Sequence, residues 1–197
     1  MPRPKSYDRQ DAIAKACSVF WEHGFQDLGV RELERLTGLN QFAIRSEFGG
    51  KEGLYLETLS YYSGVAIREE MAPMKQGRIP EIVSFFQGLV APGSMTSSNY
   101  GCLIVNTGIE NARIQSPRLE DAVRSYWNTL EDHLRVALEN ERAAQGEGAT
   151  FTPHVLAASL VPAVMGIHAQ NRSQRDQTAG RPLVDLICSI LSGYRPS

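Results

Sequence analysis

Apolar side chains recur every three or four positions along most of this chain, which is the spacing of one face of an α-helix. The first such segment runs from Asp8 to His23. Its apolar positions are Ile13, Ala16, Cys17, Phe20 and Trp21. Asp8 is suited to cap the first turn, and Gly24 is suited to end the helix. The pattern therefore predicts a first helix over these residues.

Two short helices are predicted next, over Val30–Leu36 and Gln41–Glu47. The tight connection Thr37-Gly38-Leu39 separates them, and Asn40 is a good cap for the second of the two. Two short helices joined by a turn of three or four residues that contains glycine form the helix-turn-helix pattern.

The rest of the chain also shows helical periodicity. Further helices are predicted from Lys51 toward Arg68 or Glu70, over Pro80–Val90, over Leu103–Ala112, after Ser116-Pro117, after Thr152-Pro153 and after Arg181-Pro182. We expect the loop over residues 92–101 to be the most mobile segment. No alternating strand pattern is found. The sequence thus predicts an all-α protein, with a small N-terminal helix-turn-helix domain of about 50 residues followed by a larger helical bundle.

The helix predicted over 41–47 is too polar to belong to a core. Leu39, Ile44 and Phe48 can pack inward and hold it. The outward positions are Gln41, Phe42, Arg45 and Ser46. In a helix-turn-helix unit the second helix enters the DNA major groove, and Gln, Arg and Ser reach both base edges and phosphates. Phe42 either contacts a thymine methyl group or packs on the supporting helices.

Two flanking features suit the DNA backbone. Lys51, together with the free N–H groups of the helix that it begins, suits a phosphate. The N-terminal arm with Arg3 and Lys5 is a candidate for backbone or minor-groove contact. The formal net charge is −2, and basic and acidic residues are balanced over the first 55 positions. Since net charge gives no signal, a prediction of nucleic-acid binding must rest on where the charges are placed. The motif alone does not establish DNA binding, because a helix–turn–helix also occurs in all-α domains that bind no DNA.

The sequence gives less support to a secreted, membrane, metal-binding or catalytic protein. Three widely spaced cysteines fit a reducing cytoplasm, and no signal peptide is seen. The apolar stretch over 155–169 is shorter than a membrane span. The four histidines lack metal-ligand spacing, and no nucleophile or phosphate-cradle motif occurs. The cluster Glu131-Asp132-His133 is expected to be a solvated helix face. We therefore predict a cytoplasmic protein that is not an enzyme, with no catalytic residues, metal, cofactor or membrane contact.

Residues 3–60 resemble the N-terminal domain of TetR-family transcriptional regulators. The matching segments are Phe20-Trp-Glu-His-Gly-Phe25, Val30-Arg-Glu-Leu33, Thr37-Gly-Leu-Asn40 and Phe48-Gly-Gly-Lys-Glu-Gly-Leu-Tyr55. The segment Gly101-Cys-Leu-Ile-Val-Asn106, with Glu110, resembles part of one branch of the family's ligand-binding domains.

The chain departs from the family pattern at three positions. Arg45 stands where relatives usually carry a tyrosine that touches phosphate, Glu34 stands at a site often held by alanine, and Gly29 replaces a Ser or Thr cap. Arg45 is expected to change base preference, while Glu47 beside it either repels phosphate or restrains Arg45.

The resemblance implies a domain organisation and a mechanism. The helix-turn-helix domain would cover residues 1–50 and extend into a connecting helix over 51–70, and the ligand-binding and dimerisation domain would cover 51–197. A homodimer would bind a palindromic DNA operator as a repressor and be released by a small-molecule effector. The predicted DNA-binding residues are Arg3, Lys5, Gly29, Arg31, Asn40, Gln41, Phe42, Arg45, Ser46 and Lys51.

The dimer would form through the last two long helices. The segment Leu183–Tyr194 carries more apolar surface than one buried stripe requires, and Leu156, Leu160, Val164 and Met165 add to it. The alternative is that both helices are intramolecular core. The predicted effector-pocket residues are Phe85, Phe86, Leu89, Met95, Asn106, Glu110, Trp127, Met165 and His168, with His133 as a further polar candidate.

Two alternatives to this function stay open. Cys102 starts a predicted helix beside the expected mobile loop, and a helix N-terminus lowers the pKa of a thiol, so Cys102 is a candidate sensor of oxidants or electrophiles. A buried, unreactive cysteine is the other interpretation. The second alternative is that the chain is a helical interaction module that has lost DNA binding, as Arg45 and Glu47 suggest.

Overall fold

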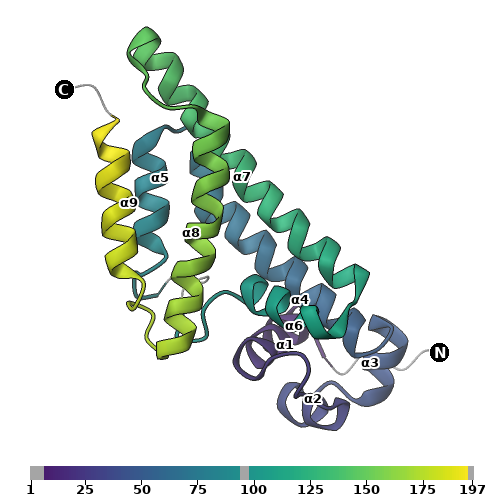
Figure 1. Cartoon of the computed structure of the whole chain (residues 1–197). Helices are drawn as coiled ribbons and strands as arrows, with labels where there is room; N and C mark the ends of the chain where they lie inside the picture. The colour runs from purple at the N-terminus through teal and green to yellow at the C-terminus, as the bar shows by residue number, and fades with distance from the viewer. Residues whose placement is uncertain (1–6, 94–97, 195–197) are drawn as a thin grey trace.

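The computed structural model describes residues 7–93 and 98–194, and these form a helical molecule (Figure 1). No strand occurs within those two ranges, so the prediction of an all-α protein is confirmed. The α-helices are α1 (Arg9–His23), α2 (Val30–Thr37), α3 (Gln41–Phe48), α4 (Lys51–Ala66), α5 (Ile79–Gly88), α6 (Leu103–Ile114), α7 (Pro117–Gln145), α8 (Pro153–Gln174) and α9 (Arg181–Gly193).

Helices α1, α2 and α3 gather at one end of the molecule, and we call them the N-terminal head (Figure 1). Phe20, Leu33, Leu39 and Ile44 are almost completely buried there. Burial of such side chains stabilises helices as short as α2 and α3, which would be marginal alone in water. The head is thus a small apolar core that carries two short helices on its surface.

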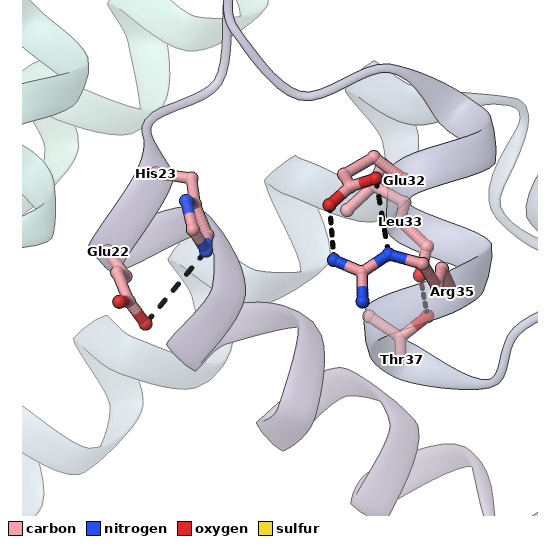
Figure 2. A network of polar contacts seen from close by, with 6 residues as sticks. All are labelled: Glu22, His23, Glu32, Leu33, Arg35 and Thr37. Atoms are coloured by element: carbon pink, nitrogen blue, oxygen red, sulfur yellow. Dashed lines mark hydrogen bonds and ion pairs between the residues drawn. The ribbon is translucent and has the colours of Figure 1, made fainter.

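The turn between α2 and α3 is held by Thr37 and Gly38. The Thr37 hydroxyl donates to the Leu33 carbonyl over 2.6 Å and accepts from the Leu39 N–H over 3.1 Å. Figure 2 shows the first of these bonds at the end of α2. Gly38 has a φ of 76°, in the left-handed region that glycine adopts at little cost. Asn40 then accepts a hydrogen bond from the Ala43 N–H, which caps α3 as predicted.

Helix α4 leaves the head and ends earlier as an α-helix than the sequence predicts. Its α-helical part stops at Ala66 and is followed by a π-helical turn, Ile67–Met71, and by a 3₁₀ turn, Ala72–Lys75. The predicted end at Arg68 or Glu70 therefore falls inside the π-helical turn. Periodicity alone cannot distinguish these forms, because both keep the chain helical through the same residues.

The larger part of the molecule is built on α7, which is 29 residues long. Helices α4, α6 and α8 contact α7, and α9 lies against α5 and α8 (Figure 1). Ser116 caps α7 as predicted. The analogous prediction for α8 is confirmed in position, since Thr152 precedes the helix and Pro153 begins it, whereas the prediction for α9 is wrong in its cap residue. Thr152 makes no side-chain cap bond to α8, and Gly180 rather than Arg181 precedes α9.

Glu110 of α6 fastens the head to the rest of the molecule. Its Oε2 accepts hydrogen bonds from the backbone N–H groups of Phe25 at 2.9 Å and Gln26 at 3.0 Å. These two residues lie between α1 and α2. A Cβ at Gly24 would lie 2.7 Å from Glu110 Oε1, so the glycine makes room for the carboxylate.

Two further hydrogen bonds reinforce the same junction. The Tyr55 hydroxyl of α4 lies 2.7 Å from the Thr107 hydroxyl of α6, and both are buried. The indole N–H of Trp21 donates to the Gly101 carbonyl over 3.0 Å. Helix α6 therefore contacts the head directly and through α4, so a displacement of α6 has a physical route to α2 and α3.

Gly53 and Gly64 lie on the same helix, α4, and give a matched test of this packing. A Cβ at Gly53 would lie 1.6 Å from the Phe48 carbonyl oxygen, whereas one at Gly64 meets nothing within 4 Å. We expect Gly53→Ala to lower the free energy of unfolding by about 1–3 kcal/mol, because α3 must shift. Gly64→Ala should leave it unchanged or raise it by up to about 1 kcal/mol through helix propensity. Urea unfolding of both variants measures this, and equal effects would contradict the close approach.

Removing the Glu110 carboxylate tests the junction. We expect Glu110→Ala to lower the free energy of unfolding by about 1–2 kcal/mol, since the N–H groups of Phe25 and Gln26 lose their acceptor and the second is open to water. Glu120→Ala is the control, because Glu120 is an exposed residue of α7 whose removal should change stability by less than about 0.5 kcal/mol. Denaturant unfolding followed by circular dichroism gives both values, and indistinguishable variants would contradict the assigned role.

Candidate nucleic-acid interface

Helix α3 turns a polar and aromatic face to solvent. Ala43, Ile44 and Phe48 are buried against the head, and this fixes which side of the helix faces outward. The exposed positions are Gln41, Phe42, Arg45 and Ser46, as the sequence predicts. Helix α3 is thus supported from behind and presents groups that form hydrogen bonds.

The aromatic ring of Phe42 points away from the supporting helices, because the residue is 79% exposed. Of the two roles predicted for Phe42, packing on those helices is therefore wrong. A ring held in water at this position is available for apolar contact with a partner, such as a thymine methyl group.

Polar residues on α3 differ in how far they are restrained. The Gln41 side chain donates to Glu34 Oε2 over 2.9 Å, which joins α2 to α3. The Ser46 hydroxyl donates to the Phe42 carbonyl over 2.8 Å. Within the described part of the chain, Arg45 makes no ion pair and is exposed. Arg45 is therefore the cation of this face with the most freedom to meet an external anion.

Glu47 lies next to this face but is half-buried and directed at Tyr7. Burial raises the pKa of Tyr7, and the nearby Glu47 carboxylate raises it further. The contact places Glu47 beside Tyr7, just before α1, so its charge is partly withdrawn from the outer surface.

The other predicted DNA contacts fall into three groups. Gly29 caps α2 without a side-chain bond and Arg31 is exposed in the first turn of α2. The Lys51 ammonium lies 4.5 Å from the centre of the Phe25 ring and 3.4 Å from the Gln26 carbonyl. Burial lowers the pKa of Lys51, while the charges of Glu110 and Asp27 act in the opposite direction. Arg3 and Lys5 lie outside the described residues.

The predicted effector-pocket residues are spread over several helices. Phe86 and Leu89 are fully buried in the core, and Phe85 is almost as buried. Trp127 on α7 and Met165 on α8 are half-buried. Burial lowers the pKa of His168 to about 4, so this imidazole is neutral at neutral pH. Met95 lies outside the described residues, as do its neighbours over 94–97 in the predicted mobile loop.

Two predicted pocket residues have structural partners. The Asn106 amide donates to the Tyr100 carbonyl over 2.9 Å. Glu110 holds the loop after α1, as described above. Asn106 and Glu110 therefore help to position neighbouring segments, and contact with an effector stays a prediction for every residue of the set.

A half-open cavity of about 860 Å³ lies where the head meets the C-terminal helices, and we call it the junction cleft. Its polar lining includes Glu22, His23, Tyr100, Asn106, Arg172 and Arg175, from α1, α6, α8 and the turn before α6. Figure 2 shows Glu22 and His23 together near the end of α1, with the carboxylate and the imidazole 3.9 Å apart. Sequence reasoning found Asn106 but neither arginine, because two basic residues near a helix end carry no distinctive pattern.

Cys102 precedes α6 and is buried, with 1% of its surface exposed. Burial raises the pKa of its thiol, and this outweighs the opposing effects of a hydrogen bond with Tyr62 and of the backbone N–H groups of Val105 and Ile104. The expectation that the helix N-terminus lowers the thiol pKa is therefore wrong, because desolvation is the larger effect.

His133 does not form the carboxylate–imidazole cluster that its neighbours suggested. It is buried, and its Nδ1 lies 2.7 Å from the Thr129 carbonyl. Asp132 instead faces solvent and pairs with Arg135. The expectation of a solvated face holds for Asp132 and is wrong for His133, since α7 is turned so that His133 points inward. Across the described part of the chain, no helix has the length and apolarity that crossing a membrane requires.

Residues 12–58 match the sequence profile of the bacterial regulatory proteins of the tetR family. The match covers α2, α3, most of α1 and the first half of α4. The chain is also 28% identical over 157 residues to the HTH-type transcriptional repressor ComR of Escherichia coli K12, covering 77% of this chain and 71% of ComR.

Solved structures share the fold over almost the whole chain. A TetR-family regulator from Cytophaga hutchinsonii superposes with a TM-score of 0.80 at 16% identity, covering 98% of this chain and 100% of that one. A cysteine variant of the TetR-family regulator CifR, solved with a 26-base-pair double-stranded operator DNA, gives 0.78 at 19% identity over 98% and 100% of the two chains. The helix-turn-helix head is therefore the N-terminal domain of the tetR family of bacterial regulatory proteins, and the chain as a whole has the fold of TetR-family regulators.

Proposed function

We propose that this protein is a cytoplasmic transcriptional repressor that binds a palindromic DNA operator as a homodimer, through α3 in the major groove, and releases it when a small molecule binds. The observation that carries the proposal is the outer face of α3. Its Phe42 ring is 79% exposed and its Arg45 lies beside it, while three residues of the same helix are buried. This face therefore offers an exposed ring and a guanidinium group to a partner, on a helix that its buried residues hold in place.

The chemistry of this face suits a DNA groove. Arg45 is suited to a guanine edge or to a phosphate, and Phe42 to the methyl group of thymine. Gln41 and Ser46 have local partners that a base or phosphate would replace at small cost, since both side chains are already exposed. Gly29, Arg31 and Asn40 lie near the start of α2 or α3, where free N–H groups attract phosphates. Lys51, Arg3 and Lys5 complete the proposed set of contacts.

The relatives support a repressor rather than another DNA-binding role. ComR is named as a transcriptional repressor, and CifR was solved on its operator DNA. Neither relative determines the operator of this chain, because Arg45 and Phe42 set the base preference and side chains of this kind vary among proteins that share a fold.

A homodimer would cover an apolar face on α8 and α9. Val184, Ile187 and Leu191 of α9 pack inside the chain, whereas Leu183, Leu186 and Ile190 are 36%, 56% and 48% exposed. The exposed positions follow each other at helical spacing and form a second apolar stripe on α9. The neighbouring outer face of α8 carries Val155, Ala158, Pro162 and Gly166, all exposed. Leu160 and Val164 are buried within the chain and are unavailable to a partner.

Dimerisation through these two helices would serve DNA recognition directly. A two-fold axis between the subunits relates their α3 helices, so that both meet the same face of a duplex at half-sites one helical turn or a multiple apart. The proposed boundary near residue 50 separates the head from this dimerisation part, with α4 as the connecting helix.

Release by an effector requires a route between the C-terminal helices and α3. The bonds from Glu110 to Phe25 and Gln26 and from Thr107 to Tyr55 are such a route. A ligand that prefers one position of α6 shifts the head between arrangements in proportion to its differential affinity. The pocket residues predicted from the sequence remain candidates for this ligand, with Asn106 and Glu110 on α6 itself.

The thiol-sensor alternative is not favoured. Cys102 is buried and its thiol pKa is raised, so at neutral pH the reactive thiolate is scarcer than in an exposed cysteine. A helical interaction module without DNA binding remains the main rival, and the first of the two following experiments separates it from a repressor.

Fluorescence anisotropy with a labelled duplex from upstream of the protein's own gene tests DNA binding. We expect Arg45→Ala to weaken specific binding by about fivefold to a hundredfold, because one side-chain contact to a base is worth about 1–3 kcal/mol. If Arg45 instead contacts phosphate, the slope of log affinity against log salt should fall by about 1. Arg124→Ala, on the exposed side of α7, is the matched control and should change neither. Should the wild-type protein bind no duplex selected from random DNA, the interaction-module alternative would be favoured.

Sedimentation velocity tests the dimer. We expect Leu186→Glu to convert the dimer into a monomer, because the carboxylate would be buried at the interface without a partner. Ser192→Glu lies on the polar side of α9 with Asp185 and should leave the dimer intact. Circular dichroism checks that both variants keep their helical content. A monomeric wild-type protein, or a dimer that tolerates Leu186→Glu, would contradict the proposed interface.

A further inference from the structure

The junction cleft is large enough to hold a small molecule and is separate from the packed core of the C-terminal helices. Its volume is about 860 Å³, within the range of about 300–1,000 Å³ that is usual for ligand sites. Three helices and one turn contribute to its lining, so an occupant would touch α1, α6 and α8 at once.

Positive charge dominates the polar lining. Arg172 and Arg175 have no carboxylate within ion-pair distance in the described part of the chain. Glu22 is the single acidic residue of the lining. Its carboxylate lies 3.9 Å from the His23 ring. Burial raises the pKa of Tyr100, and the negative charge of Glu22 raises it further. The lining thus carries two guanidinium groups against one carboxylate, which favours an anionic occupant.

The cleft also has an apolar side. Ile109 of α6 is 63% exposed and Tyr100 is 40% exposed, and Ala169 of α8 adds a small apolar surface. An exposed isoleucine beside two arginines suits a molecule with both an anionic group and an apolar body. A simple inorganic anion would leave this apolar side in contact with water.

The arginine nearest the head is held in place before any ligand arrives. Arg172 Nη1 donates to the Tyr100 carbonyl over 3.1 Å and approaches the Trp21 carbonyl at 3.5 Å. The Asn106 amide donates to the same Tyr100 carbonyl. Gly101 follows with a φ of 71°, and a Cβ there would lie 2.6 Å from the His168 carbonyl oxygen, so the turn fits closely against α8. A restrained arginine loses less conformational entropy on binding an anion.

We propose that the junction cleft binds a small organic anion, with its carboxylate or phosphate group on Arg172 and Arg175 and its apolar body against Ile109 and Tyr100. A regulatory role for the junction cleft rests on the proposed function. The effector of that function would then bind in the junction cleft rather than among Phe85, Phe86 and Trp127. Ile109 and Asn106 precede Glu110 on α6, so an occupant acts on the helix that holds the loop after α1. The factor by which the bound anion changes the affinity for DNA equals the factor by which bound DNA changes the affinity for the anion.

Isothermal titration calorimetry of the full-length protein tests the site without DNA. The probes are benzoate and phenyl phosphate, each compared with an uncharged counterpart, benzamide and phenol. We expect at least one anion to bind and its counterpart to bind at least about tenfold more weakly. Arg175→Gln should lower the affinity for that anion by about tenfold, which is typical for loss of one charge-assisted hydrogen bond. Arg175 is chosen because it is exposed and its side chain has no bond that supports the fold.

Arg113→Gln is the matched control, because Arg113 is an exposed arginine of α6 outside the cleft lining. Equal binding by wild type and Arg113→Gln, with weaker binding by Arg175→Gln, supports the site. The proposal is overturned if neither anion binds, if charged and uncharged probes bind alike, or if Arg175→Gln has no effect. DNA anisotropy on the same preparations is a separate readout. Operator binding without anion binding refutes the cleft alone, whereas anion binding without operator binding refutes the repressor and leaves the cleft supported.

Discussion

The attachment of the head through Glu110 is the constraint on which the position of α3 depends. One carboxylate oxygen of α6 accepts two backbone N–H groups from the loop after α1, and the buried pair Tyr55–Thr107 ties α6 to α4 as well. Backbone groups of a loop need partners, and a charged acceptor forms stronger bonds with them than water does. The head is consequently positioned by a few polar bonds to one helix, in addition to the apolar contact between α1 and α4.

Much of the fold could be predicted because it depends on local rules. Helical periodicity located all the α-helices of the described residues, and Asp8, Asn40 and Ser116 cap α1, α3 and α7 as their residue types indicate. The polar and exposed side of α3 followed from the positions of Ile44 and Phe48. The rule worked less well at α8 and α9, where proline marks the first turn but Thr152 makes no cap bond and Gly180 takes the cap position.

Sequence analysis missed the features of the site that depend on contacts between residues far apart in the chain. Glu110 was predicted as a ligand contact, yet its partners Phe25 and Gln26 are about 85 positions away in the chain. Cys102 was expected to have a lowered pKa from its place before a helix, but burial in the folded chain removes water from the thiol and raises that pKa, against the opposing hydrogen bond with Tyr62. Arg172 and Arg175 meet the head only because α8 ends beside the turn before α6. Periodicity reports which side of a helix is buried, and it does not report what lies opposite that side.

The balanced charge of the head raises a difficulty for DNA binding that the structure resolves. Acidic residues on α2 and α3 would repel phosphates if they were free. Glu32 instead forms an ion pair with Arg35 (Figure 2), Glu34 accepts from Gln41, and Glu47 is directed at Tyr7. Arg31 and Arg45 remain exposed and outside the ion pairs of the described residues. The charges of Arg31 and Arg45 are therefore open to solvent, while the carboxylate of Glu32 is neutralised by its ion pair. Since salt screens interactions beyond about 10 Å, the charges nearest the duplex decide the interaction, and the net charge of −2 for the whole chain has little influence on it.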